Sequence, residues 1–337
     1  MSMNITETKG VVLIKPNRLD YKKIQLPPLG NTKCLIKVHS AVINPSDWYI
    51  LSGEFQQDKE NTPTTIGFEG SGLVVQTGIS AMHLHNKRVA FHSTNSDEPG
   101  AFAHHTMIDM ENCVELPQGL DYKHGAYFFV NPWSVETMMW NCRTSGWKCI
   151  VHTAAASALG RMLVNACKDN DITLINIVRR HEQETILKDL GAKYIVNSQS
   201  TDFVQTLERL MEELNPNVFY DAVTGLVGTK VFRAMPTHTT ICMYGRLDGR
   251  GYDLDDDDME EDEFEGKELR TFSVFDVTNR FPELKDEFYN SICKNLLNGK
   301  YKSEIQAEFK FSQGMEAFAL SKTKPTKGKV LFVNDKF

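Results

Sequence analysis

One stretch of small residues follows an apolar run and precedes an amphipathic one. Residues 148–160 read KCIVHTAAASALG, and the residues that follow repeat apolar side chains at helical spacing. Small residues in a strand-to-helix turn let the backbone approach a diphosphate, and the unpaired N–H groups of the helix start attract its negative charge. The pattern predicts a dinucleotide-binding turn made by Ala154, Ala155, Ala156, Ser157, Ala158, Leu159 and Gly160.

An ordinary tight turn of an α/β protein is the alternative interpretation of this stretch. Three glycines are typical of dinucleotide-binding turns, and only the last of them is present here, at Gly160. The first two positions hold Ala155 and Ser157. The position of the turn after an apolar strand, at the head of a repeating series, favours the dinucleotide.

Two arginines follow the next apolar run. ITLINIV at 172–178 leads into Arg179 and Arg180, where enzymes that use NADH place an acid for the ribose hydroxyls. Guanidinium groups pair with a 2′-phosphate, so the sequence favours NADPH over NADH. Solvated charges at a helix start are the alternative. His181 either joins the phosphate site or lies on the surface.

Apolar runs and helical spacing alternate around the turn. Strands are expected at 148–153, 172–178, 194–198, 218–223, 239–245 and 268–276, with helices at 157–170, 182–191, 203–214 and 227–235. Helical spacing also covers 125–142. Such a series predicts an α/β fold with a doubly wound parallel sheet of six strands.

The flanking segments are expected to form a β-rich domain. Short apolar runs separated by turn residues fill residues 11–108, and the tail is expected to form a helix at 283–298, a strand at 305–311, a helix at 313–320 and a strand at 329–334. The tail would pair back with the N-terminal part. The predicted domains are therefore 1–127 with 277–337, and 128–276.

The distribution of charge along the chain limits the kinds of partner that it could bind. The net charge is -7, but the run 253–263 holds nine acids and no base, so the rest of the chain carries +2. This balance argues against a nucleic-acid partner. The acidic run is expected to be a solvated loop, with a cover against anionic substrates or a docking site for a basic partner as alternatives.

The sequence predicts an intracellular protein without a membrane-spanning segment. Its seven cysteines include no CxxC pair, which is typical of reduced thiols. No apolar run approaches the ~20 residues that cross a bilayer. The N-terminus MSMNITETKG lacks the apolar region of a secretion signal. A cytoplasmic location is predicted, and a mitochondrial one stays open.

Four motifs, in this order, resemble a known family over nearly the whole chain: NPSDWYILSG at 44–53, GFEGSGLVV at 67–75, FVNPWS at 129–134 and the VHTAAASALGRM turn. They are similar to the zinc-free branch of the medium-chain dehydrogenase/reductase superfamily, which includes quinone oxidoreductases of the zeta-crystallin type and mitochondrial 2-enoyl thioester reductases. The resemblance implies a GroES-like β-rich catalytic domain, an inserted Rossmann domain for NADPH, a cleft between them, and a homodimer paired through the strand at 268–276.

The resemblance also implies roles for single residues. Asn44 and Tyr49 would be catalytic, lining the nicotinamide end and orienting the acceptor carbonyl; a loop anchor and a half-buried aromatic are the alternatives. Further contacts with the cofactor would come from Asn131, Val223, Thr224, Tyr244 and Gly245. Trp133 and Ser134 would either join them or pack between domains.

Zinc is not expected. Zinc members of the family carry Cys where this chain has Asn44 and His where it has Phe68. Phe cannot ligate zinc, and Glu69 alone does not make a site. The cysteine-rich structural zinc lobe is also missing, because residues 91–102 contain no cysteine.

The resemblance implies an NADPH-dependent, zinc-independent reductase of quinones or α,β-unsaturated carbonyls. Enoyl thioester reductases place a proton-donating Tyr where this chain has Phe55, which weighs against that third reading. A non-catalytic NADPH-binding subunit of a larger assembly, mitochondrial or not, is the rival from another class. Phe55, the single glycine of the turn and the acidic run would all fit it.

Overall fold

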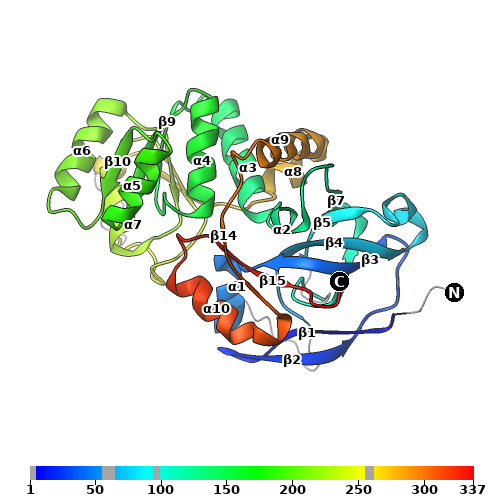
Figure 1. The fold of residues 1–337 in the computed structure, drawn as a ribbon. Coiled ribbons are helices and arrows are strands. Elements are labelled where there is room, and N and C mark those ends of the chain that lie inside the picture. Colours follow the sequence, from blue (N-terminus) through cyan, green and yellow to red (C-terminus); the bar gives the residue numbers. More distant parts are fainter. Residues whose placement is uncertain (1–4, 55–64, 94–98, 255–261) are drawn as a thin grey trace. The chain divides into compact units, whose positions relative to one another are not determined.

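The computed structural model describes residues 5–54, 65–93, 99–254 and 262–337. The chain divides into two compact units (Figure 1). The β-rich unit holds Met1–Pro132 with Tyr289–Phe337, and the α/β unit holds Trp133–Phe288. The sequence analysis placed the domain boundaries at residues 127 and 276, and the compact units change after Pro132 and after Phe288.

The α/β unit is built on six parallel strands in the order β10-β9-β8-β11-β12-β13. Numbered along the chain, this order is 3-2-1-4-5-6, that of a doubly wound Rossmann sheet. The predicted fold class is confirmed. The strand bounds are β8 Cys149–His152, β9 Thr173–Val178, β10 Tyr194–Asn197, β11 Val218–Asp221, β12 Thr240–Met243 and β13 Glu268–Thr271.

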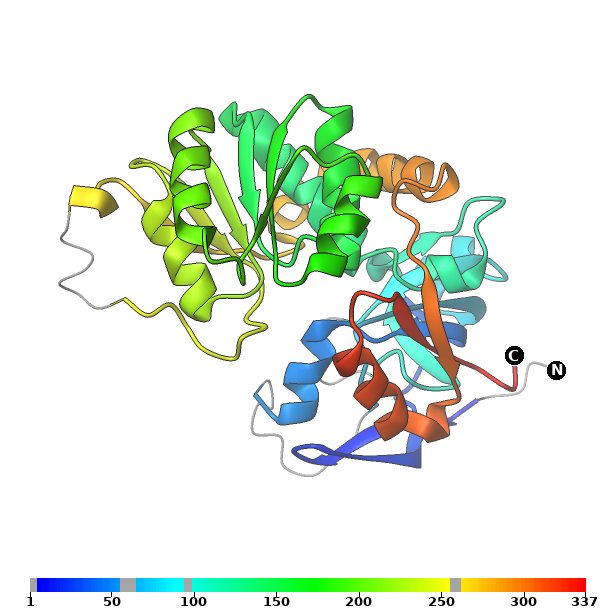
Figure 2. The ribbon, with the colours of Figure 1, turned by 60° about the vertical axis from the view of Figure 1, so that its left-hand side comes forward.

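Helices cover both faces of this sheet (Figure 2). Helix α6 shows why they pack there: it buries Phe203, Leu207, Leu210 and Met211, which recur at helical spacing on one face. The helices of this region are α3 Val130–Ser145, α4 Ala158–Asp169, α5 His181–Asp189, α6 Phe203–Leu214, α7 Gly225–Ala234, α8 Asp276–Arg280 and α9 Lys285–Leu297. Short 3₁₀ turns lie at Asp262–Phe264 and Pro282–Leu284.

The β-rich unit contains a hairpin and a larger sheet. The hairpin pairs β1 Glu7–Lys15 with β2 Arg18–Gln25. The sheet has the order β14-β15-β3-β4-β5-β7, with β6 beside β3. Strand β15 pairs antiparallel with β3, so the tail does return to the N-terminal part as predicted. The bounds are β3 Lys33–Val42, β4 Glu69–Thr77, β5 Arg88–His92, β6 His105–Asp109, β7 Cys113–Glu115, β14 Ile305–Phe309 and β15 Lys329–Val333.

Short helices join the strands of this unit. They are α1 Pro45–Ser52, α2 Tyr122–Gly125 and α10 Gly314–Thr323, with 3₁₀ turns at Ile79–Leu84, Met110–Asn112 and Phe311–Gln313. Neither α1 nor β2 was predicted. Helix α1 has only eight residues, too few to show a period, and β2 (RLDYKKIQ) has mostly polar, exposed side chains.

The expected helix at 125–142 and the expected strand at 268–276 differ clearly from the elements in the structure. The expected helix at 125–142 is two helices, because Pro132 is tolerated only in the first turn and α3 therefore begins at Val130. The sixth strand ends at Thr271 rather than at residue 276. There the chain turns, with Asp276 N donating to Ser273 O at 3.3 Å, and α8 begins.

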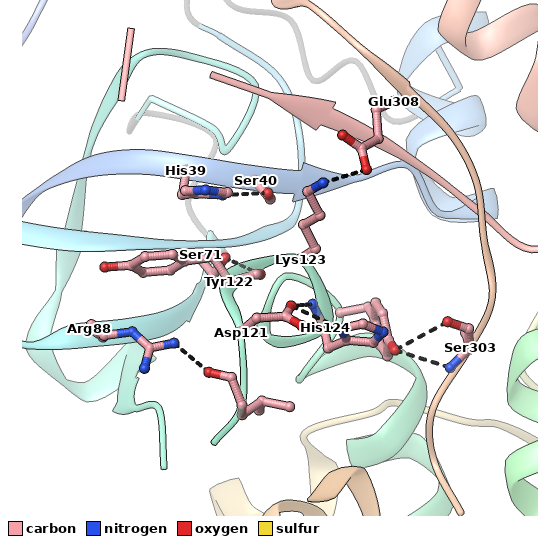
Figure 3. Close-up of polar contacts among 12 residues, drawn as sticks. His39, Ser40, Ser71, Arg88, Asp121, Tyr122, Lys123, His124, Ser303 and Glu308 are labelled. Carbon is pink, nitrogen blue, oxygen red and sulfur yellow. Dashed lines mark hydrogen bonds and ion pairs between the residues drawn. The ribbon is translucent and has the colours of Figure 1, made fainter. Parts of the chain in front are cut away.

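The chain that leads into α3 is anchored through α2 (Figure 3). The Tyr122 ring stacks on His39 of β3 with centroids 4.6 Å apart. Lys123 Nζ lies 2.6 Å from Glu308 Oε1 of β14. Asp121 caps α2 by accepting from His124 N at 2.8 Å. Contacts to two strands therefore hold the approach to α3 within the β-rich unit.

The seven cysteines all lie within the described ranges, where each is buried and none is joined to another. Among the helices that the structure describes, none is both long and apolar enough to cross a membrane.

Candidate functional site

The predicted dinucleotide turn follows β8 and leads into α4. Ser157 caps α4, its Oγ accepting from Gly160 N at 3.1 Å. A Cβ on Gly160 would lie 2.2 Å from Ala155 O, so only glycine lets the helix close on the turn. The N–H groups of Ala158 and Leu159 have no acceptor within the helix, as at any helix start. These groups can receive a diphosphate.

Ala154 adopts a left-handed backbone conformation, with φ 51°. An L-residue pays about 1–2 kcal/mol for this conformation, and glycine does not. We therefore expect Ala154→Gly to raise the free energy of unfolding by about 0.5–1 kcal/mol, measured by urea denaturation without nucleotide. Ala155→Gly is the matched control. Ala155 is buried and has no positive φ, so the loss of its methyl group should lower the free energy of unfolding. If both variants lowered the free energy of unfolding equally, the backbone of Ala154 would not be strained.

Arg179 and Arg180 stand directly after β9, beside that turn. Both side chains are exposed, and within the described part of the chain neither forms an ion pair. Gln183 Oε1 accepts from both backbone N–H groups, at 2.9 and 3.1 Å, which fixes the backbone between β9 and α5. His181 is 82% exposed and lies 3.4 Å from Glu184, the geometry of a surface residue. The two guanidinium groups are free to take an anion.

A buried carboxylate shapes the end of β11. Asp221 accepts from Thr153 Oγ1 at 2.5 Å, from Val223 N at 2.8 Å and from Tyr252 OH at 2.9 Å. Burial raises the pKa of Asp221, and these donors oppose the rise. Thr224 has φ 58°, a strained conformation for a β-branched residue. Backbone strain of this kind is often found at active sites and ligand-binding segments.

The next segment lies along this edge. Tyr244 N donates to Asp221 O at 2.8 Å, and the backbone of Gly245 follows it closely. Leu247 N donates to Ala222 O at 2.9 Å, which keeps the segment against the end of β11. The predicted pairs at 223–224 and 244–245 thus lie together, at the carboxyl ends of neighbouring strands.

In the β-rich unit, Asn44 belongs to a buried polar set. It precedes α1 at the position where Asn usually caps a helix, but its side chain makes no cap bond. Its Oδ1 accepts from Lys329 Nζ at 2.7 Å, and its Nδ2 donates to Glu69 Oε1 at 2.8 Å. Asn44 and Glu69 are wholly buried, and Lys329 is 6% exposed. We name Asn44, Asp47, Glu69 and Lys329 the buried polar set.

Glu69 also holds the start of α3. Its Oε2 accepts from Phe129 N at 2.9 Å and from Val130 N at 3.0 Å, and a carboxylate stabilises a helix N-terminus. Asn131, the predicted cofactor contact, is the second residue of this helix and is 7% exposed. Burial raises the pKa of Glu69, and the Lys329 ammonium and the N–H donors oppose the rise.

Asp47 completes the buried polar set from the first turn of α1. Its Oδ2 accepts from Asn44 N at 2.7 Å. Burial raises the pKa of Asp47 to about 8 and lowers that of Lys329 to about 8. The burial of these groups thus disfavours the charged form of each, and their mutual attraction opposes that effect. Tyr49, on the same helix, is half-buried.

Family models match both parts of the chain. The alcohol dehydrogenase GroES-like domain matches residues 30–118, and a model named zinc-binding dehydrogenase matches residues 190–331. The mitochondrial enoyl-[acyl-carrier-protein] reductase of Caenorhabditis elegans is 23% identical over 72% of this chain and 70% of its own length. The human quinone oxidoreductase is 22% identical over 60% of this chain, and the match spans 61% of the human protein.

Solved structures share the fold over nearly the whole chain. A proposed NADPH:quinone reductase from Mesorhizobium loti is 29% identical, with a TM-score of 0.88 over 98% of this chain and 100% of that one. The chain belongs to the medium-chain dehydrogenase/reductase superfamily. The Escherichia coli quinone oxidoreductase, solved with NADPH, shows the superfamily fold at 17% identity, with a TM-score of 0.84 over 96% of this chain and 99% of that one.

Residue types argue against the zinc site of other superfamily members. Position 68 is a half-buried Phe, and the Asn44 amide is already engaged by two charged groups. In the part of the chain that the structure describes, no three His, Cys, Asp or Glu side chains are grouped to hold a metal ion. Zinc independence stays a prediction that rests on these residue types.

The predicted residues of this superfamily member fall into two groups, one in each unit. The first group lies at the carboxyl ends of four adjacent strands, β9, β8, β11 and β12. It consists of the turn at 154–160 after β8, Arg179 and Arg180 after β9, and the pairs at 223–224 and 244–245 after β11 and β12. Asn44, Tyr49 and Asn131 lie in the β-rich unit. Trp133 is 3% exposed and donates to Thr278 Oγ1 at 3.2 Å, and Ser134 is 5% exposed, so both pack inside the α/β unit.

Sequence reasoning missed several residues of these sites. Asp221 carried a signal, since an acid that ends an apolar strand at this edge is unusual. Lys329 and Asp47 carried none, because a lysine that starts a strand and an acid in a first helical turn are ordinary surface features. Tyr252 directly precedes the acidic run, and no local pattern links it to Asp221.

Proposed function

We propose that this chain is an NADPH-dependent, zinc-independent reductase that transfers hydride to a quinone or an α,β-unsaturated carbonyl. The observation that carries the proposal is the carboxyl edge of the α/β sheet. There a tight strand-to-helix turn stands beside two exposed arginines that form no ion pair with other described residues. A cradle for diphosphate beside two cations is the chemistry that a 2′-phosphorylated dinucleotide requires.

The protein side of the reaction is binding, orientation and charge stabilisation. The turn at 154–160 would hold the diphosphate, and Arg179 and Arg180 the 2′-phosphate. When bound, NADPH supplies the hydride. Asn44 and Tyr49 would orient the acceptor carbonyl, whose oxygen gains negative charge as the hydride adds, and hydrogen-bond donors stabilise that charge. Contacts from Asn131, Val223, Thr224, Tyr244 and Gly245 would complete the cofactor site.

The names of the relatives suggest two classes of hydride acceptor for this chain, quinones and enoyl thioesters. Residue 55, where the enoyl reductases carry their acid, is Phe and lies outside the described residues. A side chain without a hydroxyl cannot donate the proton, which favours quinones and simple enones over acyl thioesters.

Oligomeric state and location stay predictions. Strand β13 is the edge of the six-stranded sheet, and all four of its residues are exposed. This fits the homodimer edge that the superfamily resemblance implies. A cytoplasmic location, with a mitochondrial one open, rests on the sequence alone. Residues 255–261 of the acidic run lie outside the described residues, and its role as a solvated loop stays a prediction.

Turnover with 9,10-phenanthrenequinone tests the function. We expect NADPH oxidation to depend on the quinone, and Tyr49→Phe to lower kcat about 100-fold because it removes a donor to the developing oxyanion. Tyr194→Phe, at the start of β10, is the matched control and should keep full activity. A direct titration with NADPH and NADH should accompany the kinetics.

Each other outcome has a meaning. Tight NADPH binding without turnover of any quinone or enone would replace the reductase by a non-catalytic NADPH-binding subunit. Absence of binding by either nucleotide would remove the cofactor assignment itself. If Tyr49→Phe turned over the quinone as fast as the wild type, the proposed function would stand, but the proposed role of Tyr49 would be wrong.

A further inference from the structure

Two cations stand at the N-terminus of α5, where the helix itself disfavours them. Arg180 occupies the N-cap position, and Arg179 precedes it. Ser, Thr, Asp and Asn are preferred at an N-cap, and the positive end of the helix dipole repels cations. Arg180 makes no side-chain cap bond, and neither guanidinium group pairs with a described acid. Helix stability therefore does not explain the two arginines, whereas a bound anion would offset both charges.

Gln183 supplies the cap that Arg180 lacks. Its Oε1 accepts from Arg179 N at 2.9 Å and from Arg180 N at 3.1 Å, and its own N–H donates to Arg180 O at 3.0 Å. One side chain thus ties the backbones of both arginines to the first turn of α5. Because these hydrogen bonds fix the backbone at both positions, they also fix the directions in which the two arginine side chains leave it.

The cap is neutral, although a glutamate can accept the same hydrogen bonds in such a position. A carboxylate at residue 183 would place a negative charge beside the site that the arginines offer to an anion. Glu184, the next acid, is engaged elsewhere, since its Oε1 accepts from Asn197 Nδ2 of β10 at 2.7 Å. The exposed Glu182 forms no ion pair with either arginine. The first turn of α5 therefore leaves both guanidinium charges uncompensated.

We propose that Gln183 is the positioning residue that makes this site selective for NADPH, because it fixes Arg179 and Arg180 for the 2′-phosphate and adds no negative charge. This inference rests on the proposed function, in which the two arginines bind that phosphate. Groups that are held in place before binding lose little freedom when the ligand arrives, which strengthens binding. NADH lacks the 2′-phosphate, so the arrangement does not strengthen its binding.

Titrations with NADPH and NADH test the role of Gln183. In Gln183→Ala the arginine backbones lose their acceptor, so NADPH should bind about 10-fold more weakly while NADH binding stays within about twofold. Gln313→Ala is the matched control, because Gln313 Oε1 accepts from Lys310 N at 3.1 Å in the same type of capping contact within the β-rich unit. It should leave both affinities unchanged. Equal weakening of NADPH and NADH in Gln183→Ala would make Gln183 a helix cap only and overturn the proposal.

A second variant, Gln183→Glu, separates the charge of residue 183 from its hydrogen bonds. The carboxylate can accept from the same two N–H groups, so the thermal stability should match that of the wild type. Its negative charge should weaken NADPH binding about 10-fold at low salt, and added salt should reduce this loss by screening. NADH binding should stay within about twofold. If Gln183→Glu bound NADPH as tightly as the wild type, the neutral side chain would have no role, against the proposal.

A mutant cycle with the arginines shows whether Gln183 acts through them. When Arg179 and Arg180 are both alanine, adding Gln183→Ala should change NADPH affinity by less than about twofold. A further loss of about 10-fold in that background would show that Gln183 acts without the arginines and would overturn the proposal. Failure of the proposed function has a different result, because the wild type would then bind NADPH no more tightly than NADH. If the wild type prefers NADPH and Gln183→Ala keeps that preference, only the inference about Gln183 fails.

Discussion

NADPH is expected to bind about 100-fold more weakly when Arg179 and Arg180 are both replaced by alanine, while NADH binding stays within about twofold. Hydrogen bonds to a charged group contribute about 1.5–3 kcal/mol each, and only NADPH carries the phosphate. Both side chains are exposed and unpaired to other described residues, so their removal should leave the fold intact. Fluorescence titration with each nucleotide measures the change.

His181→Ala is the matched control for the arginine pair. His181 is the next residue and 82% exposed, with its ring beside Glu184, so its loss should leave both affinities unchanged. Equal weakening of NADPH and NADH by the double arginine variant would mean that the arginines support the turn rather than the 2′-phosphate. Unchanged NADPH binding would place the 2′-phosphate elsewhere.

A methyl group at Gly160 is expected to cost about 2–3 kcal/mol of unfolding free energy and at least about tenfold in dinucleotide affinity. The added Cβ would lie 2.2 Å from Ala155 O and 2.6 Å from Ala155 C. These are backbone atoms, so the start of α4 must move away from the turn. Urea denaturation and nucleotide titration of Gly160→Ala measure the two effects.

Gly251→Ala is the control for this substitution. A Cβ at Gly251 would meet nothing within 4 Å, and its φ is not positive. Its effect should stay within about 0.5 kcal/mol. If Gly160→Ala kept both its stability and its affinity, close packing of α4 on the turn would not be what the last glycine provides.

Local periodicity was enough to predict the α/β fold. Strands such as CIVH and TLINIV lie inside a parallel sheet, so they are mostly apolar, and helices such as α6 show one apolar face. These patterns depend only on neighbours in the chain. The same holds for the turn at 154–160 and for the two arginines after β9, because position relative to a strand end is a local property.

The elements that the sequence did not reveal have weak local signals. Helix α1 is short and β2 is mostly polar, and contacts with the rest of the β-rich unit hold them in place. The sixth strand ends early because the chain turns at Val274 and Phe275, with Asp276 N donating to Ser273 O, although the apolar residues there resemble those of a strand.

Asn44 marks the limit of reading a site from the sequence. The residue itself was predicted, from a motif that spans positions 44–53. Its partners Glu69 and Lys329 come from strands β4 and β15, and no local pattern links positions 69 and 329 to position 44. Hydrogen bonds between segments distant in the chain depend on the pairing of strands, which only the tertiary structure decides. The sequence by itself thus determined which residue types stand at strand ends and turns, and the fold decided which of them meet.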